Sequence, residues 1–269
     1  MSDPTRPPQP RIISVSNQKG GVGKTTTTIN LGAALTEEGY NVLLVDLDPQ
    51  GNASTGLGLD PDQRKVTTYD LLLDDVPLDQ VIHKTSIEGL TLAPSTTDLS
   101  SADIEMMSVE KRSFLLHDAL RQPAIDAYEL DFILIDCPPS LSLLTINAMV
   151  ASDSILIPLQ SEFYALEGLS QLMLTVRQVR ESANPNLRIE GVLLTMYDSR
   201  NNLSQQVEAD ARDTLGGLVY QTVVPRNVRV SEAPSYAMPV TSYDPSSKGA
   251  LAYRALAQEM VEKQNTTAT

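Results

Sequence analysis

The amino-acid sequence predicts a single α/β domain with a mostly parallel, twisted sheet and helices on both faces. Short apolar runs alternate with segments of helical periodicity along nearly the whole chain, an order that is typical of parallel sheets. The strand-like runs are continuously apolar rather than alternating, which indicates burial on both faces. A length of 269 residues suits one such domain.

The expected elements follow one another from residue 11 onward. Strands are predicted at residues 11–16, 41–46, 90–93, 131–136, 154–159, 188–196 and 219–224. Helices are predicted at residues 25–38, 100–107, 111–121, 141–150, 165–182, 203–214 and 248–263. We therefore expect one domain over residues 11–264, between a flexible proline-rich tail at 1–10 and a polar tail at 265–269.

The composition is that of a soluble globular protein with an acidic balance. Hydrophobic residues make up 41% of the chain and the formal net charge is −14, which taken alone argues against nucleic-acid binding. The single cysteine, Cys137, excludes an internal disulfide and suits a reducing cytoplasm. No run of about 18 apolar residues occurs, so no transmembrane helix is expected. His83 and His117 lack metal-ligand neighbours.

A glycine-rich stretch, NQKGGVGKTTTT at residues 17–28, joins the first predicted strand to the first predicted helix. Its glycines let the backbone fold around a ligand without Cβ clashes. The N–H groups at the start of the helix then face an anion. The stretch therefore predicts a phosphate-binding P-loop.

Two side chains of this loop carry the expected chemistry. Lys24 would reach the β- and γ-phosphates of a nucleotide, and Thr25 would place its hydroxyl on Mg²⁺. The loop departs from the usual pattern at one position, because Gln18 stands where that pattern has glycine. A second lysine, Lys19, follows it.

Acidic side chains close two further predicted strands. Asp46 and Asp48 end the run VLLVDLD, and Asp136 ends the run FILID. Ligands of parallel sheets bind at the carboxyl ends of the strands, so these carboxylates are expected near the phosphates. Asp136 has the form of a Walker B acid, which we expect to reach Mg²⁺ through water. Asp46 is expected to support the Mg²⁺ shell or the loop.

The run KGGVGKTT, from Lys19 to Thr26, resembles the deviant Walker A motif of the ParA/MinD group of P-loop ATPases. The resemblance covers about residues 11 to 260 and implies ATP and Mg²⁺ as cofactors. It implies that Lys19 crosses a dimer interface to the phosphates held by the other subunit, and that Asp48 positions the attacking water. The predicted catalytic residues are thus Lys19, Lys24 and Asp48. The predicted phosphate-binding residues are Lys19, Gly20, Gly21, Val22, Gly23, Lys24, Thr25 and Thr26.

Two later segments, TMYDSR and VVPRNVRVSEAPSYAMPV, are predicted as loops and resemble the purine pocket of the same family and its surroundings. The residues that this resemblance places around adenine are Met196, Pro225, Arg226 and Asn227. It also places Arg200 and Arg229 at positions that bind DNA without sequence preference, and Lys248 and Arg254 would extend the patch. From Arg177 to Arg254 basic residues outnumber acidic ones by nine to eight, against 20 to 34 in the whole chain. The alternative is that these four are ordinary solvated surface charges.

The function that the resemblance implies is that of a ParA/Soj-type switch. Such a protein forms an ATP-dependent homodimer, binds non-specific double-stranded DNA and hydrolyses ATP slowly. With a ParB-like centromere-binding partner it segregates a chromosome or plasmid. The expected location is the bacterial cytoplasm, on the nucleoid and not on a membrane.

Other functions remain open at this point. A related ATPase positions another cargo, such as a chemosensory cluster, on the nucleoid. A MinD-like membrane switch would need a basic amphipathic C-terminal helix, but the ending LAQEMVEKQNTTAT has one lysine. A nitrogenase iron-protein type needs two cysteines per subunit, and a metabolic kinase needs an acceptor lid. A DNA-bound regulator that hardly hydrolyses ATP also fits the sequence.

Overall fold

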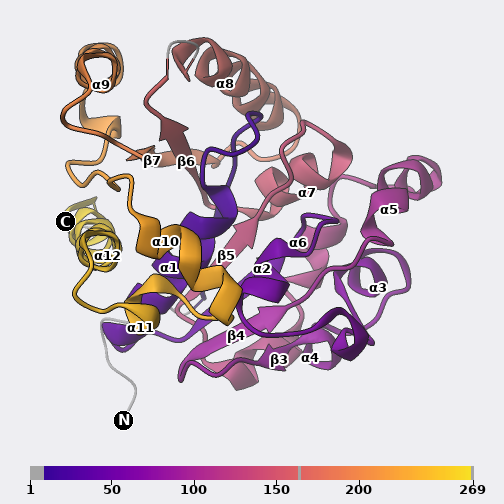
Figure 1. The fold of residues 1–269 in the computed structure, drawn as a ribbon. Helices are drawn as coiled ribbons and strands as arrows, with labels where there is room; N and C mark the ends of the chain where they lie inside the picture. The colour runs from indigo at the N-terminus through magenta and orange to yellow at the C-terminus, as the bar shows by residue number, and fades with distance from the viewer. Residues whose placement is uncertain (1–8, 163–164, 268–269) are drawn as a thin grey trace.

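The computed structural model describes residues 9–162 and 165–267 (Figure 1). Within these ranges the chain forms a seven-stranded sheet with the order β3-β4-β2-β5-β1-β6-β7. The strands are β1 (Arg11–Val15), β2 (Val42–Asp46), β3 (His83–Lys84), β4 (Leu90–Ala93), β5 (Phe132–Asp136), β6 (Ser154–Gln160) and β7 (Arg188–Thr195). All neighbouring pairs are parallel except β3 with β4. The predicted α/β class with a mostly parallel sheet is confirmed.

Helices cover both faces of the sheet (Figure 1). They are α1 (Lys24–Glu37), α2 (Asn52–Gly56), α3 (Thr68–Leu73), α4 (Leu78–Val81), α5 (Leu99–Glu105), α6 (Leu115–Ala119), α7 (Leu143–Ala151), α8 (Ala165–Ser182), α9 (Asn202–Leu215), α10 (Val228–Glu232), α11 (Val240–Tyr243) and α12 (Lys248–Thr267). Short 3₁₀ turns join several of them. None of the described helices combines the length and apolar character that a membrane span requires.

Consecutive residues of the central strands belong to different hydrophobic clusters, as burial on both faces demands. Ile13 of β1 packs with α1 and α12, whereas its neighbour Ile12 packs with α3 to α7. In β2 the same alternation separates Leu44 from Leu43. A third cluster joins β6 and β7 to α8 and α9. The continuous apolar runs of the sequence therefore reflect a sheet with no solvated face at its centre.

The order of the strands creates the position for a ligand. β1 lies between β5 and β6. From β1 the chain crosses over β5 to reach β2, and from β5 it crosses over β1 to reach β6. The connections thus diverge in opposite directions around β1 and β5. In open parallel sheets a ligand binds outside the carboxyl ends of the strands at such a switch point.

The prediction of a strand at 219–224 is wrong, because this segment makes only an isolated bridge at Val219, and a second isolated bridge follows it at Pro225. Tyr220 N–H donates to the carbonyl of Val192 in β7 at 3.0 Å. The next two N–H groups, of Gln221 and Thr222, instead donate to the Glu259 carboxylate of α12, both at 2.8 Å. A side chain from a distant helix therefore interrupts the ladder that the apolar run would otherwise continue.

Other boundaries also differ from the prediction. The helix expected at 111–121 is limited to α6, because Lys111 has a positive φ of 57° that a helix does not accommodate. The edge strand β3 and the short helices α2 to α4, α10 and α11 were not predicted. α12 continues to Thr267, through part of the predicted polar tail, and most of the tail predicted at 1–10 lies outside the described residues.

We expect Glu259→Ala to lower the free energy of unfolding by about 1–3 kcal/mol, the cost of leaving bound N–H groups without their charged acceptor. Burial raises the pKa of Glu259, but the hydrogen bonds from Gln221 and Thr222 outweigh it, so that the folded-state pKa is lowered. The stabilisation by the Glu259 carboxylate is therefore present at neutral pH, and it is lost as the pH falls through that lowered pKa. Urea unfolding at pH 7 measures the change.

The matched control is Glu181→Ala, which removes an exposed i,i+4 ion pair with Arg177 on α8. Such a pair contributes about 0.3–0.5 kcal/mol. Equal losses for the two variants would contradict the bridging role of Glu259.

Candidate functional site

The glycine-rich loop leads directly from β1 into α1. Gly23 is the N-cap of α1 and adopts a left-handed conformation with φ 85°, and Gly21 has φ 74°. Residues with a side chain rarely adopt such angles, so glycine is required at both points. The Thr195 hydroxyl donates to the carbonyl of Val22 at 2.8 Å and fixes the loop to the end of β7. The N-terminus of α1 is thereby held open toward an anion.

Lys24 lies inside this loop. It is 6% exposed, and its Nζ donates to the carbonyl of Lys19 at 3.1 Å. Burial lowers the pKa of Lys24, and the nearby carboxylate of Asp136 acts in the opposite direction. The ammonium group is thus held within the turn of the loop, where a phosphate would neutralise it.

Lys19 has a different environment at the other end of the loop. Its ammonium group forms an ion pair with Glu162, just beyond β6, and the two side chains are 40% and 46% exposed. Its backbone N–H donates to Asn17 Oδ1 at 3.0 Å. The two lysines therefore differ in exposure: the loop encloses the Lys24 ammonium group, whereas the Lys19 ammonium group is at the surface.

Asp136 and Asp46 are cross-strand partners at the carboxyl ends of β5 and β2, and both are fully buried. Asp136 Oδ1 accepts from the Thr28 hydroxyl at 3.2 Å, but Oδ2 is buried with no hydrogen-bond partner. Burial and then the charge of Asp46 raise the pKa of Asp136 well above its usual value, whereas a hydrogen bond from Thr25 lowers it.

The residues fit a Mg²⁺ ion that is bound together with phosphates. The unpaired Oδ2 of Asp136 offers an acceptor, and the Thr25 hydroxyl lies close to the same carboxyl group. No cluster of three or more His, Cys, Asp or Glu side chains suited to a metal exists in the described residues. Mg²⁺ usually takes one or two protein carboxylates and completes its shell with phosphate and water, so the sparse donor set suits it.

Asp46 forms hydrogen bonds with the segment that follows β2. Its Oδ2 accepts from the Ser54 N–H at 2.9 Å and from the Ser54 hydroxyl at 2.7 Å. Its Oδ1 accepts from the Asp48 N–H at 3.1 Å. Burial raises the pKa of Asp46 to about 6, although these hydrogen bonds oppose the shift.

Asp48 lies two residues after the end of β2, at the start of the turn that the Gly51 N–H closes by donating to the Asp48 carbonyl. It is 8% exposed, and its Oδ1 accepts from the Gln50 N–H at 3.0 Å. The charge of Asp48 acts on the pKa values of both Lys24 and Asp136. The structure therefore brings together Lys24, Asp46, Asp48 and Asp136, which the sequence placed at the ends of three different strands.

Of the residues predicted around adenine, Met196 lies beside the loop. Met196, with φ 51°, follows β7, and its Cε lies 3.9 Å from the position that a Cβ on Gly23 would take. The Tyr197 N–H donates to the carbonyl of Val224, and the Arg226 N–H donates to the carbonyl of Tyr197, both at 3.0 Å. The residue after Met196 is therefore paired with the backbone on either side of Pro225. Asn227 caps α10 by accepting from the Arg229 N–H at 2.8 Å.

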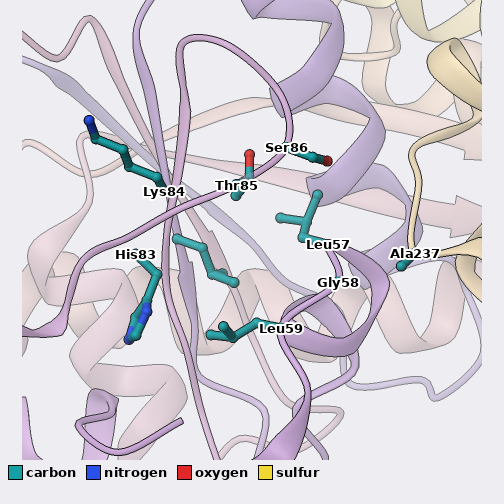
Figure 2. A pocket seen from close by; sticks show the side chains of 9 residues that line it. Leu57, Gly58, Leu59, His83, Lys84, Thr85, Ser86 and Ala237 are labelled. Carbon is teal, nitrogen blue, oxygen red and sulfur yellow. The ribbon is translucent and has the colours of Figure 1, made fainter. Parts of the chain in front are cut away.

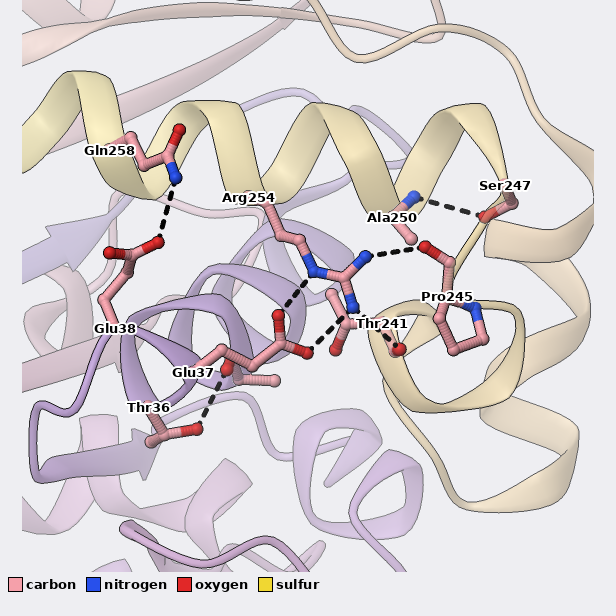
Figure 3. Close-up of polar contacts among 10 residues, drawn as sticks. Thr36, Glu37, Glu38, Thr241, Pro245, Ser247, Ala250, Arg254 and Gln258 are labelled. Atoms are coloured by element: carbon pink, nitrogen blue, oxygen red, sulfur yellow. Dashed lines mark hydrogen bonds and ion pairs between the residues drawn. The ribbon is translucent and has the colours of Figure 1, made fainter.

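The predicted DNA-contacting residues divide into two kinds. Arg200, Arg229 and Lys248 are exposed, although Arg200 pairs with Asp198, and Arg229 with Glu232 and Asp244. Arg254 is instead directed at the chain itself (Figure 3).

The guanidinium of Arg254 holds α12 against α1 and α11. It forms an ion pair with Glu37 of α1 and donates to the carbonyls of Pro245 at 2.6 Å and Thr241 at 3.3 Å (Figure 3). Its side chain is 28% exposed. One residue of the predicted patch thus contributes to helix packing, a role that neither the DNA-binding prediction nor the alternative of solvated surface charges included.

Sequence reasoning missed three groups that shape the site. Glu162, the partner of Lys19, lies in a run for which no chemistry was inferred. Ser95 and Arg64 both lie against the turn from Asp48 to Gly51. Along the chain they are 47 and 16 positions after Asp48. A local motif carries no signal for such contacts, because the partners are brought together only by the fold.

A separate cavity of about 300 Å³ lies between the end of α2 and the β3 strand (Figure 2). Leu57, Leu59 and Leu92 line it together with His83 and Thr85, and Lys84 points away from it (Figure 2). None of the predicted site residues lines this cavity.

Comparison with known proteins agrees with this geometry. A family model described as an AAA domain matches residues 10–189. The chain is 52% identical over 254 residues to the chromosome partitioning protein ParA of Caulobacter vibrioides, covering 94% of this chain and 95% of that protein. It is also 52% identical over 250 residues to the sporulation initiation inhibitor protein Soj of Bacillus subtilis, covering 93% and 98%.

A solved structure of similar fold is cobyrinic acid a,c-diamide synthase from Mycobacterium smegmatis with bound ADP and magnesium. Its TM-score is 0.82 at 38% identity, with 96% of this chain and 97% of that chain covered. A nucleotide and magnesium are thus bound by a protein of this fold.

We expect Lys24→Met to weaken nucleotide binding more than about 30-fold, because removing one partner of a buried charge pair costs about 2–5 kcal/mol. Without nucleotide the variant should melt no lower than the parent, since burial already disfavours the charged form of Lys24. Equilibrium titration with a fluorescent ATP analogue measures the affinity. Lys65→Met, at an exposed lysine, is the control, and unchanged affinity in Lys24→Met would contradict the P-loop assignment.

Proposed function

Because the chain belongs to the ParA/Soj family of partition ATPases, we propose that it is an ATP-dependent dimerising switch that segregates a chromosome or plasmid. In this proposal the dimer binds non-specific DNA on the bacterial nucleoid. A ParB-like centromere-binding protein stimulates slow ATP hydrolysis and releases the dimer. The amide-forming activity named for the M. smegmatis protein is not proposed, since that relative is less similar than the two partition proteins.

The contrast between the two lysines is the observation that carries the proposal. Lys24 is enclosed by its own loop, whereas Lys19 is half exposed and paired with Glu162. A cation at the surface beside the phosphate site can serve the nucleotide of a second subunit. On dimerisation Lys19 would exchange the Glu162 carboxylate for the partner's phosphates. The dimer would then form only when ATP supplies those phosphates.

ATP would bind with its phosphates along the loop from Lys19 to Thr26 and its adenine against Met196, Pro225, Arg226 and Asn227. Thr25 and Asp136 would hold Mg²⁺, which neutralises phosphate charge when bound. Asp48 is suited to orient a water molecule because its charge acts on both Lys24 and Asp136 and its side chain is not fully buried. Phosphoryl transfer needs an oriented nucleophile more than a strong base.

We assign Arg200, Arg229 and Lys248 to the DNA-binding face and Arg254 to the fold. The first three are exposed, and the ion pairs of Arg200 and Arg229 are with surface acids. Exposed pairs are worth about 0–1 kcal/mol each, so DNA phosphates can replace the acids. Dimerisation doubles the number of phosphate contacts, and each contact adds affinity that falls with salt.

The membrane-switch alternative is disfavoured by the packing of α12. Its apolar face, which includes Tyr253, Leu256 and Met260, is buried in the cluster with α1. Arg254 and Gln258 bind Glu37 and Glu38 of α1 along the same contact (Figure 3). A membrane-binding helix must present its apolar face to lipid, and here that face belongs to the core.

Asp48→Ala should bind ATP with nearly the parental affinity and hydrolyse it about 100-fold more slowly, because the attacking water loses its orienting group. The ATP-bound dimer should then persist. Phosphate release and the molar mass from light scattering in ATP and Mg²⁺ test both points, with the exposed Asp62→Ala as control. A monomeric Asp48→Ala variant in saturating ATP would contradict the proposed role.

Arg200→Glu combined with Arg229→Glu should abolish most DNA binding while leaving ATP-dependent dimers intact. Each lost phosphate contact lowers the salt slope of binding by about 1. Fluorescence anisotropy with a labelled random duplex measures affinity, and light scattering checks the dimer. The control is Arg177→Glu on α8, an arginine that is also exposed and paired with a surface acid. Unchanged affinity and slope in the double variant would place the DNA face elsewhere.

A further inference from the structure

Arg64 is a buried arginine that belongs to none of the motifs predicted from the sequence. It is 7% exposed and follows a 3₁₀ turn at Pro61–Gln63. Its Nε and Nη2 donate to the carbonyl of Leu59 at 2.9 and 2.6 Å, and Nη2 also donates to the Thr55 hydroxyl at 2.7 Å. Its Nη1 donates to the carbonyl of Ser95 at 3.1 Å. The guanidinium therefore joins α2, the segment after it and the segment after β4.

Ser95 carries this connection to the backbone of Asp48. The Ser95 hydroxyl donates to the Asp48 carbonyl at 2.5 Å, and that carbonyl also accepts from the Gly51 N–H at 2.9 Å. The Ser95 N–H donates to the Ser54 hydroxyl at 3.1 Å, which in turn donates to Asp46. Ser95 is fully buried. The turn that presents Asp48 is thus bound through its backbone carbonyl, which leaves the carboxylate free of these contacts.

Arg64 and Ser95, which we call the brace, fit closely against the turn at Gly51. Gly51 has a positive φ of 61°, and a Cβ on it would clash with Arg64 Nη1 and come within 3.0 Å of the Ser95 carbonyl. The guanidinium therefore occupies the space that any other residue at position 51 would need. Arg64 and Ser95 together fill the concave side of the Asp48 turn.

We propose that Arg64 and Ser95 are positioning residues for ATP hydrolysis, which act by fixing the turn that carries Asp48. The inference rests on the proposed role of Asp48 in orienting water. The contacts of Arg64 and Ser95 are to the segments after β2 and β4, whereas the phosphate loop follows β1 and is anchored to β7 through Thr195. Loosening the brace should therefore affect turnover and leave nucleotide binding unchanged.

The geometry also makes the substitutions tolerable. On its outer side Arg64 borders an open polar cavity of about 450 Å³, lined among others by Lys65, Thr67 and Thr97. A shorter polar side chain at position 64 would admit water there instead of leaving an empty void in the core. Ser95→Ala removes a single hydroxyl and leaves the Asp48 carbonyl bound to the Gly51 N–H.

The experiment compares Ser95→Ala, Ser95→Thr, Arg64→Gln and the control Ser100→Ala in the full chain with Mg²⁺-ATP. Ser100 lies five residues after Ser95, in α5, and its hydroxyl donates to the Thr97 carbonyl at the surface. We expect kcat to fall about 5- to 10-fold in Ser95→Ala and about 10- to 100-fold in Arg64→Gln, with ATP affinity within about twofold of the parent. Ser95→Thr, which keeps the hydroxyl, should recover most of the loss.

A second readout does not depend on hydrolysis. Hydrogen–deuterium exchange of the peptide spanning residues 47–57, without nucleotide, should be faster in Ser95→Ala and Arg64→Gln and parental in Ser100→Ala. If the parent protein hydrolyses no ATP, the proposed function is wrong. The exchange measurement still shows whether Arg64 and Ser95 restrain the turn that carries Asp48. Parental exchange in both variants, or lowered melting temperature with unchanged kcat, would overturn the proposal.

Discussion

The burial of opposed charges at the carboxyl ends of the central strands is the constraint on which the rest of this structure depends. Asp46 and Asp136 face each other across adjacent strands without solvent, and Lys24 is the cation enclosed beside them. Burial raises the pKa of both carboxyl groups and lowers that of Lys24. Such an arrangement is costly alone, and we propose that bound phosphate and Mg²⁺ offset this cost. The strand order places the ends of β2 and β5 side by side, next to the loop that follows β1.

The surroundings of the charged centre link it to two surfaces of the molecule. On one side Lys19 and Glu162 form an exposed ion pair at the edge of the loop. On the other side α1 runs from the loop to α12, where Arg254 and Glu37 join the two helices. Asn30 of α1 strengthens this link, since its side chain accepts from the Val240 N–H at 2.6 Å at the start of α11. Nucleotide at the loop and DNA at α10 to α12 would thus act on connected elements.

The sequence was sufficient for the features that depend on neighbouring residues. The continuous apolar runs located the strands of the sheet except β3, and the order of strand, glycines, lysine and helix located the glycine-rich turn between β1 and α1. What it missed depends on contacts between distant residues. Glu259 interrupts the predicted strand at 219–224 from 37 and 38 positions away, and Glu37 pairs with Arg254 from 217 positions away. The Arg64 and Ser95 contacts belong to the same class, because only the folded chain brings them to Asp48.

The central claim of this account is that ATP controls attachment to DNA through a dimer. The most direct test is the affinity of the purified protein for non-specific duplex DNA with ATP, with ADP and without nucleotide, across a series of salt concentrations. The account predicts binding that requires ATP and weakens steeply as salt rises, because it depends on displacing ions from phosphates. Equal affinity in all three nucleotide states, or no binding in any of them, would contradict it.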